Sequence, residues 1–424
     1  MDFKIPYGRE GINFSLPEEK IAGVLTSKAS KYEPELEQQA LVYRALASPA
    51  GSEKLSQLAK NKDEVVIICS DHTRPVPSRF MIPPMLAEIR EGNPDASIKL
   101  LIATGFHRPS TREELEEKFG EKVVENEEIV IHKSTEKSTM VDCGILPSGG
   151  RLRLNKTAVE ADLLIAEGFI EPHFFAGFSG GRKSVLPGVA SKETVLANHC
   201  GEFIAHEKAR TGIFEGNPMH KDMLYAAEKA DLAFILNVAI NENKEIINAF
   251  AGDFKEAHEK GCEFVAELAG ARALPADIVI TTNGGYPLDQ NIYQAVKGMT
   301  AAEATCKAGG VIIIAAECSD GHGGESFYKT FREASSVQQI REDIKSRDRT
   351  ETVSDQWESQ ILARILDKFE VIMITEAPQA MVENMHMSKA GSIEEALDLA
   401  DKKLDNRDSS ITVIPDGVGI IVQK

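Results

Sequence analysis

The sequence predicts an α/β protein of two domains, each built on a largely parallel, doubly wound sheet. Three observations carry this prediction. At 424 residues the chain is longer than one hydrophobic core usually serves. Apolar runs of strand length alternate along it with helical patterns. These runs are continuously apolar, which is typical of parallel strands that are covered by helices on both faces of the sheet.

The predicted elements follow one another in a regular order. Strands are expected at Glu64–Cys69, Ile98–Ala103, Ile129–His132, Asp162–Ala166, Ala233–Val238, Asp277–Thr281, Gly310–Ala315, Glu370–Thr375 and Ser410–Pro415. Helices are expected at Ser78–Glu91, Ser110–Phe119, Asp253–Leu268, Leu288–Ala308, Ser359–Lys368 and Ser392–Leu404.

The domain boundary is predicted near residues 270–275, where a long helix ends in small residues and a new strand begins. We therefore expect an N-terminal α/β domain of residues 1–272 and a C-terminal α/β domain of residues 273–424. No low-complexity linker separates them, which predicts two closely packed domains with an active-site cleft between them.

Composition limits the partners and the compartment. A net charge of −18 argues against nucleic acid or an anionic membrane as the main partner, because both are bound by surplus Lys and Arg. The first residues lack the basic start and apolar core of a signal peptide, and no apolar run approaches the length that crosses a bilayer. Six scattered cysteines without C-x-x-C spacing suit a reducing compartment. These features predict a cytoplasmic protein.

The segment of residues 171–199, EPHFFAGFSGGRKSVLPGVASKETVLANH, is where we expect the chemistry. His173 and His199 can act as bases or metal ligands, and Lys183 is a nucleophilic amine. Gly180 and Gly181 allow backbone amides to approach an anion closely. No packing requirement explains this combination of residues directly after a strand-like run.

Residues 177–184, GFSGGRKS, match the phosphate-binding pattern G-x-x-x-x-G-K-[ST] except at Arg182, which replaces the last glycine. In a true P-loop the turn continues into a helix that faces the phosphates, whereas Pro187 and Gly188 here interrupt such a helix. A P-loop-like nucleotide hydrolase therefore remains an alternative from another functional class, distinguishable by ATP turnover with magnesium.

Two more polar clusters directly follow predicted strands, where ligands bind in α/β folds. The first, SDHTRP, contains Asp71, Thr73 and Arg74, and the guanidinium group of Arg74 suits a carboxylate or phosphate. The second, TGFHRP, contains His107 in a position suited to a general base. With His173 at the end of another strand, two imidazoles could form an acid/base pair.

A third cluster, GGYPLDQNIYQAVKG, opens the first helix of the predicted C-terminal domain. Tyr293 and Lys297 are four residues apart and so lie on one helix face, with Gln294 beside them. The position of this cluster after a strand suggests substrate binding, although such a helix surface is normally just solvated.

Taken together, SDHTRP, TGFHRP, EPHFFAGFSGGRKSVLPGVAS with ANH, GGYPLDQNIYQAVKG and SDQWES resemble the nickel-pincer lactate racemase family. The motifs occur in the same order and with nearly the same spacing across almost the whole chain. The resemblance implies that Lys183 carries a covalent pyridinium-3,5-bisthiocarboxylic acid mononucleotide that holds nickel, and that His199 is a nickel ligand. It also implies a dependence on the enzymes that make this cofactor.

The same resemblance implies the remaining roles. His107 and His173 would be the catalytic acid/base residues. The other site residues would be Asp71, Thr73, Gly180 and Gly181 toward the cofactor, and Arg74, Tyr293, Gln294, Lys297 and Trp357 toward the substrate.

The expected activity is interconversion of D- and L-lactate by reversible hydride transfer. Removing a proton from the α-carbon is difficult beside a carboxylate, whereas removing hydride gives a planar keto acid. No G-x-G-x-x-G opens a helix, so a dissociable nicotinamide dinucleotide is not indicated. Racemisation or epimerisation of a larger 2-hydroxy acid is the alternative within the class. A nickel-storage or nickel-delivery protein that uses the same histidines is a further alternative.

Overall fold

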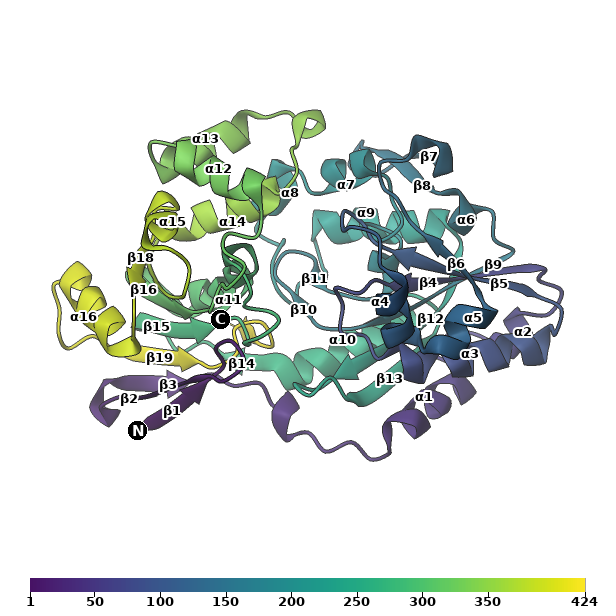
Figure 1. Ribbon diagram of the computed structural model, residues 1–424, viewed down its shortest axis with the longest axis horizontal. Coiled ribbons are helices and arrows are strands. Elements are labelled where there is room, and N and C mark those ends of the chain that lie inside the picture. The colour runs from purple at the N-terminus through teal and green to yellow at the C-terminus, as the bar shows by residue number, and fades with distance from the viewer. Residues whose placement is uncertain (424) are drawn as a thin grey trace. The chain divides into compact units, whose positions relative to one another are not determined.

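The computed structural model describes residues 1–423, apart from the side chain of Ser30, and it divides into two compact units (Figure 1). The N-terminal unit comprises Ala29–His199 and His206–Leu268. The C-terminal unit comprises Met1–Lys28, Cys200–Ala205 and the chain from Ala269 onward.

The N-terminal unit is built on a six-stranded sheet with the order β13-β12-β9-β4-β5-β6. Its strands are β4 (Glu64–Ser70), β5 (Ser97–Ala103), β6 (Glu128–Ile131), β9 (Leu163–Phe169), β12 (Leu232–Ile240) and β13 (Ile246–Gly252). All neighbours are parallel except the edge pair β12–β13. Short strand pairs join β7 (Met140–Ile145) to β8 (Arg151–Asn155) and β10 (Pro172–His173) to β11 (Gly177–Phe178).

Helices cover both faces of this sheet, which is why its strands are apolar throughout. They are α1 (Gln38–Ala47), α2 (Leu55–Leu58), α3 (Ser78–Gly92), α4 (Arg112–Phe119), α5 (Glu121–Asn126), α6 (Lys156–Val159), α7 (Lys192–Asn198), α9 (Pro218–Lys229) and α10 (Glu256–Ala269). Alternate strand residues such as Ile67, Leu100 and Ile165 form one core with apolar side chains of α1 to α5. The intervening residues, such as Ile68 and Leu101, are equally buried on the opposite face.

The C-terminal unit contains a fully parallel six-stranded sheet with the order β18-β17-β16-β15-β19-β3. Its strands are β3 (Ile21–Val24), β15 (Ala276–Thr282), β16 (Cys306–Ala315), β17 (Glu370–Ile374), β18 (Ser388–Ala390) and β19 (Ile411–Ile414). The unit also has the hairpin of β1 (Asp2–Ile5) and β2 (Ile12–Ser15), and a parallel pair of β14 (Gly270–Arg272) and β20 (Ile421–Gln423).

The helices of the C-terminal unit follow its strands along the chain, except α8, which lies in the separate segment Cys200–Ala205. They are α8 (Gly201–Ala205), α11 (Ile292–Thr305), α12 (Glu325–Glu333), α13 (Val337–Ser346), α14 (Gln356–Leu366), α15 (Gln379–Asn384) and α16 (Ile393–Leu404). The predicted helix of residues 288–308 is shorter in the structure. The side chain of Asn291 accepts the amide N–H of Gln294 and caps its start, and β16 begins directly after its last residue.

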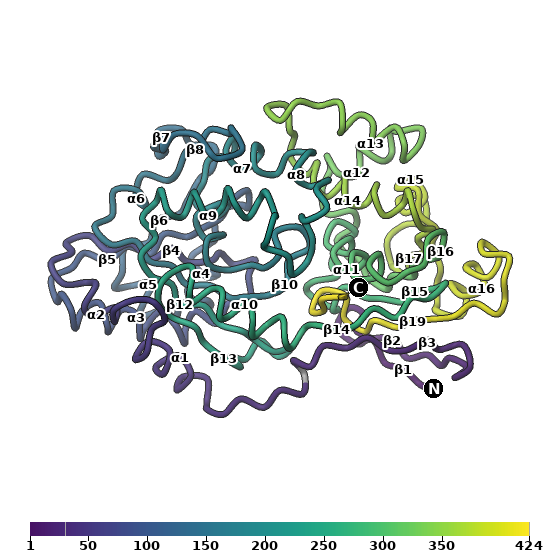
Figure 2. The backbone as a smooth tube through the Cα atoms, turned by 180° about the vertical axis from the view of Figure 1, so that it is seen from behind, coloured from purple at the N-terminus to yellow at the C-terminus, as the bar shows by residue number. Residues whose placement is uncertain are grey.

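The predicted α/β class with largely parallel sheets is confirmed, and every predicted strand coincides with an observed one. The first 28 residues differ from the predicted division of the chain. Although the prediction assigned them to the N-terminal domain, β3 pairs with β19, and Figure 2 shows this early segment beside the late one. Phe3, Ile5, Phe14 and Leu16 complete the core of the C-terminal unit. The chain passes from the N-terminal unit into the long last segment of the C-terminal unit between Leu268 and Ala269, close to residues 270–275, where the boundary was expected.

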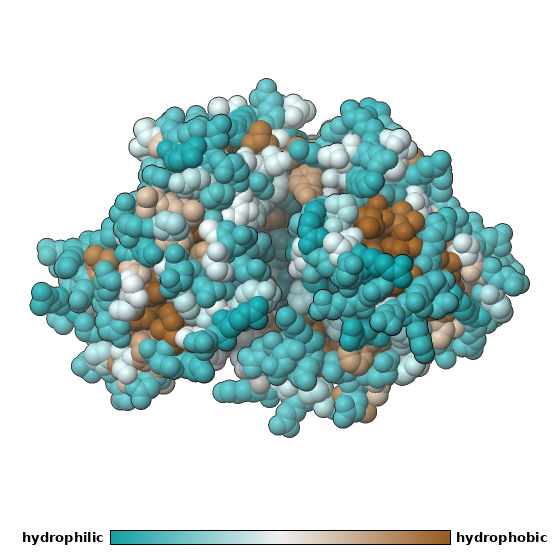
Figure 3. Space-filling model, viewed as in Figure 1, coloured by the Kyte–Doolittle hydropathy of each residue, from teal (hydrophilic) through white to brown (hydrophobic). Residues whose placement is uncertain are grey.

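The surface drawn in Figure 3 is mainly hydrophilic, with small apolar areas. Exposed apolar side chains such as Tyr43 and Ile145 belong to separate elements. Within residues 1–423, no helix combines the length and the apolar character that crossing a membrane requires.

Candidate active site

The predicted polar clusters of the N-terminal unit follow three neighbouring strands. The order β9-β4-β5 places the carboxyl ends of these parallel strands side by side at one edge of the sheet. The loop after β4 contains Asp71, Thr73 and Arg74, the loop after β5 contains His107, and the segment after β9 contains His173 and Lys183. This edge is where α/β folds bind their ligands.

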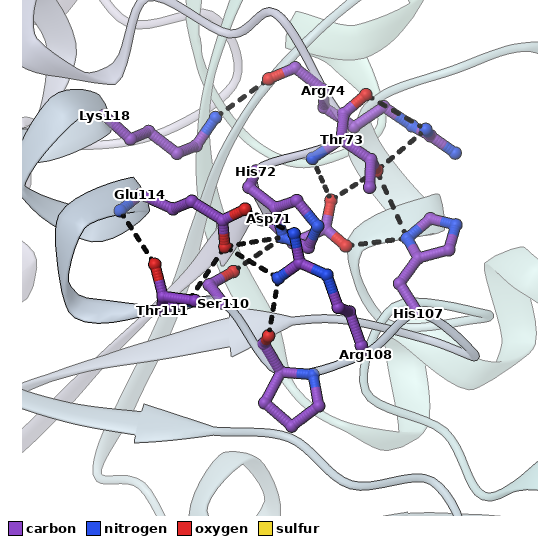
Figure 4. Close-up of polar contacts among 11 residues, drawn as sticks. Asp71, His72, Thr73, Arg74, His107, Arg108, Ser110, Thr111, Glu114 and Lys118 are labelled. Carbon is purple, nitrogen blue, oxygen red and sulfur yellow. Dashed lines mark hydrogen bonds and ion pairs between the residues drawn. The ribbon is translucent and has the colours of Figure 1, made fainter. Parts of the chain in front are cut away.

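His107 and Asp71 form a hydrogen-bonded pair (Figure 4). Nδ1 of His107 lies 2.6 Å from Oδ2 of Asp71, which is buried. Burial acts to raise the pKa of Asp71, but the hydrogen bond and charge of His107, the hydroxyl of Thr73 and the charge of Arg74 together lower this pKa to about 2. Asp71 is therefore ionised and accepts the N–H of Nδ1, so the lone pair of a neutral His107 lies on Nε2. This tautomer suits a general base.

Thr73 connects Asp71 to Arg74. The Thr73 hydroxyl donates to Oδ1 of Asp71 at 2.6 Å and accepts from a guanidinium N–H of Arg74 at 3.1 Å. Figure 4 shows the Thr73 hydroxyl in contact with both Asp71 and His107, with the guanidinium group of Arg74 beyond it. Arg74 is exposed, and the contacts with Thr73 engage only one of its terminal nitrogens. Its planar fork therefore retains donors for a carboxylate.

A buried carboxylate holds the loop after β4 at both ends. Glu167, on β9, accepts the backbone N–H and the hydroxyl of Ser70, both at 2.8 Å, and the hydroxyl of Ser78 at 3.2 Å. Ser70 ends β4 and Ser78 begins α3, so the contacts bracket the residues that carry Asp71 and Arg74. A single glutamate in an apolar strand gave no sequence signal for this role.

The loop that carries His107 is tied to the segment that carries Lys183. The amide N–H of Gly105 donates to the carbonyl of Gly188 at 3.2 Å. Gly105 has a φ of +52°, which an L side chain rarely adopts. Arg108, which follows His107, pairs with Glu114 of α4 and so belongs to the support of the loop (Figure 4).

Phe175 brings three of the predicted residues together. Its ring centroid lies 4.5 Å from that of His173 and 5.3 Å from that of His199, and Nζ of Lys183 lies 5.7 Å from it. The two imidazoles and the amine thus surround one aromatic side chain. Phe175 was not among the predicted site residues, although it lies two residues after His173 in the motif EPHFFAGF.

The environment of His199 fits a metal ligand. His199 is buried at the end of α7, and burial, together with the charge of Lys183, lowers its pKa to about 3. Its Nδ1 lies 3.1 Å from the carbonyl oxygen of Val195, so this nitrogen carries the proton and Nε2 carries the lone pair. Ligating histidines typically donate their other N–H to a backbone carbonyl in this way.

Nickel at His199 would need donors that the protein does not supply. Among the residues described, no group of three or more His, Cys, Asp or Glu side chains lies close enough to hold a metal ion. A pincer nucleotide joined to Lys183 would bring its own carbon and sulfur donors, and Ni(II) accepts planar N and S ligand sets. The position of Lys183 beside His199 therefore fits the group that the resemblance implies.

His173 has a different hydrogen-bond pattern from His107. Its Nδ1 lies 3.3 Å from the amide nitrogen of Ala176 and accepts that N–H. In the neutral imidazole this places the proton on Nε2. The two predicted catalytic histidines thus present opposite tautomers, a base at Nε2 of His107 and a donor at Nε2 of His173.

Gly180 and Gly181 are required by close packing. A Cβ atom on Gly180 would lie 2.7 Å from Oδ1 of Asn237, and one on Gly181 would lie 2.6 Å from the ring of His258. The amide N–H of Gly181 donates to Oδ1 of Asn237. In this arrangement it is not directed to an anion, which differs from the phosphate-cradling turn expected from the sequence.

The GRKS turn also differs from a P-loop. It is a single 3-10 turn of Gly181–Ser184, and the next helix, α7, begins only at Lys192. Arg182 is fully buried and donates to the carbonyls of Phe178 and Ala176 at 2.8 and 2.7 Å. The residue that breaks the phosphate-binding pattern thus folds the glycine-rich segment around its guanidinium group.

The predicted substrate residues of the C-terminal unit also form a cluster. Tyr293, Gln294 and Lys297 lie on α11, and Trp357 lies on α14. Nε1 of Trp357 donates to the Tyr293 hydroxyl at 3.0 Å, and Nζ of Lys297 donates to Oε1 of Gln294 at 2.6 Å. The sequence placed Tyr293 and Lys297 on one helix face, and the contact with Trp357 adds a second helix to it.

Comparison with known proteins gives the same family for both halves of the chain. The lactate racemase N-terminal domain family matches residues 7–212, and the lactate racemase C-terminal domain family matches residues 271–422. A lactate racemase of Thermoanaerobacterium thermosaccharolyticum is 58% identical over 424 residues, covering 100% of this chain and 99% of the relative. A lactate racemase of Lactiplantibacillus plantarum is 53% identical over 420 residues, covering 99% of each.

Solved structures agree. The lactate racemase apoprotein from T. thermosaccharolyticum matches with a TM-score of 0.97 at 58% identity, covering 100% of both chains. A protein from Thermotoga maritima matches with a TM-score of 0.68 at 22% identity, covering 92% of this chain and 100% of the other. At that identity the second match shows the fold alone.

Proposed function

The chain belongs to the lactate racemase family of isomerases, and from this membership we propose that it interconverts D- and L-lactate. The observation that carries the proposal is the arrangement of His173, Lys183 and His199 around Phe175. It combines a proton donor, a covalent attachment point and a neutral metal ligand in one place. The base, His107, lies on a loop tied to the same segment.

A nickel-pincer pyridinium mononucleotide, once made and loaded by its biosynthesis enzymes, would supply the hydride acceptor of the reaction. Lys183 would hold it through a thioamide, and Nε2 of His199 would hold its nickel. Asp71 and Thr73, whose side chains are already linked by a hydrogen bond, would contact it. Gly180 and Gly181 would contribute indirectly, by allowing the turn that carries Lys183 to form. A Cβ atom at either position would clash with Asn237 or His258.

The two histidines would carry the proton. When hydride leaves C2 of lactate, the hydroxyl proton must leave its oxygen to give the planar keto acid. Nε2 of His107 would accept this proton while Asp71 stabilises the imidazolium that forms. His173, protonated as the imidazolium, would return a proton from Nε2 to the oxygen when hydride comes back to the other face of C2, and would be left as the neutral imidazole.

The substrate carboxylate would be bound by side chains with fixed charge or fixed donors. Arg74 offers a planar fork that Thr73 already orients. Lys297 offers an ammonium group held by Gln294, and Tyr293 and Trp357 form a rigid aromatic pair. A carboxylate held by such fixed donors would be bound in a defined orientation, which proton transfer at the neighbouring hydroxyl requires.

A larger 2-hydroxy acid remains the alternative substrate of the same reaction. The single 3-10 turn at Gly181–Ser184, with its amide bonded to Asn237, speaks against a nucleotide hydrolase. The absence of a three-ligand cluster among residues 1–423 speaks against storage of nickel by protein ligands alone.

The test is a racemisation assay on protein produced together with the cofactor biosynthesis enzymes. Chiral chromatography should show D-lactate formed from L-lactate and the reverse, with lower kcat/KM for longer 2-hydroxy acids. Intact-mass analysis should show one adduct, which Lys183→Ala abolishes and the control Lys192→Ala, nine residues away, retains. Full activity without an adduct, or ATP turnover with magnesium in place of racemisation, would overturn the proposal.

A further inference from the structure

Arg182, which directly precedes Lys183, is a buried cation that no anion balances. Its side chain is 0% exposed, and none of its hydrogen-bond partners among residues 1–423 is a carboxylate. Removing a cation from water is costly unless its donors are all satisfied inside the protein. The retention of a charge at this position therefore calls for a reason in what the guanidinium group binds.

The donors of Arg182 are directed to main-chain carbonyls and one imidazole. Nη2 donates to the carbonyl oxygen of Ala176 at 2.7 Å, and Nη1 donates to those of Phe178 and Gly180 at 2.8 and 3.3 Å. Nε donates to Nδ1 of His220 at 3.1 Å. Burial and the charge of Arg182 lower the pKa of His220 to about 3, so this ring is neutral and can accept. Such an acceptor set requires a planar fork with several donors.

The acceptors of Arg182 belong to both of the segments that carry predicted site residues. Ala176 lies in the turn between β10 and β11, the hairpin that carries His173. Its amide N–H donates to Nδ1 of His173 at 3.3 Å, while its carbonyl oxygen accepts from Arg182. Gly180 immediately precedes the 3-10 turn that carries Lys183. One guanidinium group thus holds the main chain around both site residues.

We infer that Arg182 is a positioning residue that fixes the acid/base residue His173 relative to the cofactor attachment point Lys183. The inference rests on the proposed function, because it assumes that both residues serve one reaction. Hydride and proton are transferred at neighbouring atoms of lactate, so a displacement of about 1 Å between the two segments would cost on the order of 10²-fold in rate. Arg182 acts through main-chain groups and is itself fully buried.

The main experiment is the substitution Arg182→Lys, which keeps the positive charge but cannot bind three carbonyls and an imidazole at once. Rates are normalised to the adduct on Lys183, measured by intact mass. In both directions kcat per adduct should fall by about 10²-fold. KM for lactate should stay within about threefold, because the residues that hold the substrate carboxylate are unchanged. A kcat per adduct within threefold of wild type would overturn the inference.

A second readout reports the link itself in the apoprotein, without catalysis. By NMR of isotope-labelled wild type, Nδ1 of His173 should show the chemical shift of a hydrogen-bonded acceptor, and the amide proton of Ala176 should exchange slowly. Both signals should move toward free values in Arg182→Lys, because the main chain at Ala176 is no longer held. A free Nδ1 in the wild type, or unchanged signals in the variant, would refute the link.

The matched control is His220→Phe. Phenylalanine keeps a ring in the place of the imidazole, which stacks on Phe214 with centroids 4.2 Å apart, and it removes only the acceptor of Nε. The three carbonyl contacts stay, so kcat per adduct should remain within about threefold of wild type and the Ala176 signal should not change. If His220→Phe lowered kcat as much as Arg182→Lys does, packing would cause the effect, and the role of the carbonyl contacts would be refuted.

If Arg182→Lys does not fold, the wild-type apoprotein still decides. The Nη protons of Arg182 should give separate, slowly exchanging NMR signals, because the carbonyls hold the guanidinium group in one orientation. A single averaged, rapidly exchanging signal would refute the inference even in an active racemase. Conversely, a loaded wild type that does not racemise lactate would refute the proposed function, while these signals would still report the link between the two segments.

Discussion

The Asp71–His107 pair leads to the sharpest mutational prediction, for the substitution Asp71→Asn. The pKa of Asp71 falls from 3.8 to about 2 in the folded protein, despite burial, and a shift of this size corresponds to about 2.5 kcal/mol. Because the folded-state pKa is depressed, this stability is fully present above the unfolded-state pKa and is lost as the pH falls toward 2. At neutral pH, Asp71→Asn should therefore lower the free energy of unfolding by about 2 kcal/mol.

The catalytic effect of Asp71→Asn should be much larger than its effect on stability. An amide cannot hold His107 in the tautomer with its lone pair on Nε2 as an ionised carboxylate does, nor stabilise the imidazolium. In catalytic pairs of this kind the loss of the carboxylate typically costs about 10⁴ in kcat. We expect kcat for lactate to fall by about 10³ to 10⁴ in both directions, with the covalent adduct still on Lys183.

Two measurements check this prediction. Urea unfolding of the apoprotein gives the change in stability, and polarimetry of the loaded enzyme gives the forward and reverse rates. The control is Asp162→Asn, because Asp162 accepts the amide N–H groups of Asp63 and Glu64 at the opposite end of the same strands. It should lose some stability and keep its kcat. An Asp71→Asn enzyme with kcat within threefold of wild type would refute the role of the pair.

Four more predictions follow from the site. His199→Ala should lose most of its nickel, measured by plasma mass spectrometry, whereas His107→Ala should keep the metal and lose turnover. Loss of nickel in His107→Ala together with activity in His199→Ala would contradict both assigned roles. Arg74→Lys should lower kcat/KM nearly as much as Arg74→Ala, because an ammonium group cannot form the bidentate hydrogen bonds of a guanidinium group to a carboxylate. A wild-type kcat/KM in both variants would show that Arg74 is not part of the site. Phe175→Leu should fold, since leucine preserves much of the volume, but should contain several-fold less nickel per protein, and full occupancy would contradict its organising role. Burial lowers the pKa of His132 to about 4, so His132 is neutral in the folded protein. As the pH falls from about 6.5 to about 4, the unfolded chain binds a proton at His132 that the folded protein does not, and the free energy of unfolding should fall by about 3 kcal/mol. Urea unfolding of wild type that does not depend on pH across this range would refute the prediction.

The fold was predictable wherever strands are buried on both faces. EVVIIC and GVIIIA are continuous apolar runs because helices cover both sides of each sheet. β3 was not predicted, because this edge strand of only four residues, IAGV, is mostly half-buried and contains a glycine. Its pairing with β19, almost 400 residues later, has no local signal.

The site was predictable to the level of residue types at strand ends. The sequence placed His107, Asp71 and Lys183 in loops that follow strands, and the strand order brings those loops to one edge. It did not predict that Asp71 pairs with His107, since the resemblance assigned Asp71 to the cofactor. Pairing across two loops depends on tertiary packing, which local patterns do not encode.

The glycine-rich turn shows the same limit. Gly181 was interpreted from a phosphate-binding pattern, whereas its lack of a side chain accommodates His258, and its amide bonds to Asn237. Both partners come from elements more than fifty residues further along the chain. The phosphate-binding pattern therefore drew attention to the correct segment of the chain. The reason for a glycine at position 181 is its packing against His258 and Asn237.

The central claim, racemisation by hydride transfer with proton transfer at the substrate oxygen, is tested most directly by running the reaction in D₂O. Loaded enzyme should convert L-lactate to D-lactate that retains protium at C2, because the hydrogen leaves and returns as hydride while His107 and His173 exchange protons only at the hydroxyl. Mass spectrometry of the product after one half-life gives the answer. Deuterium at C2 in proportion to turnover would mean that a histidine removes the α-proton itself, which would contradict the proposed mechanism.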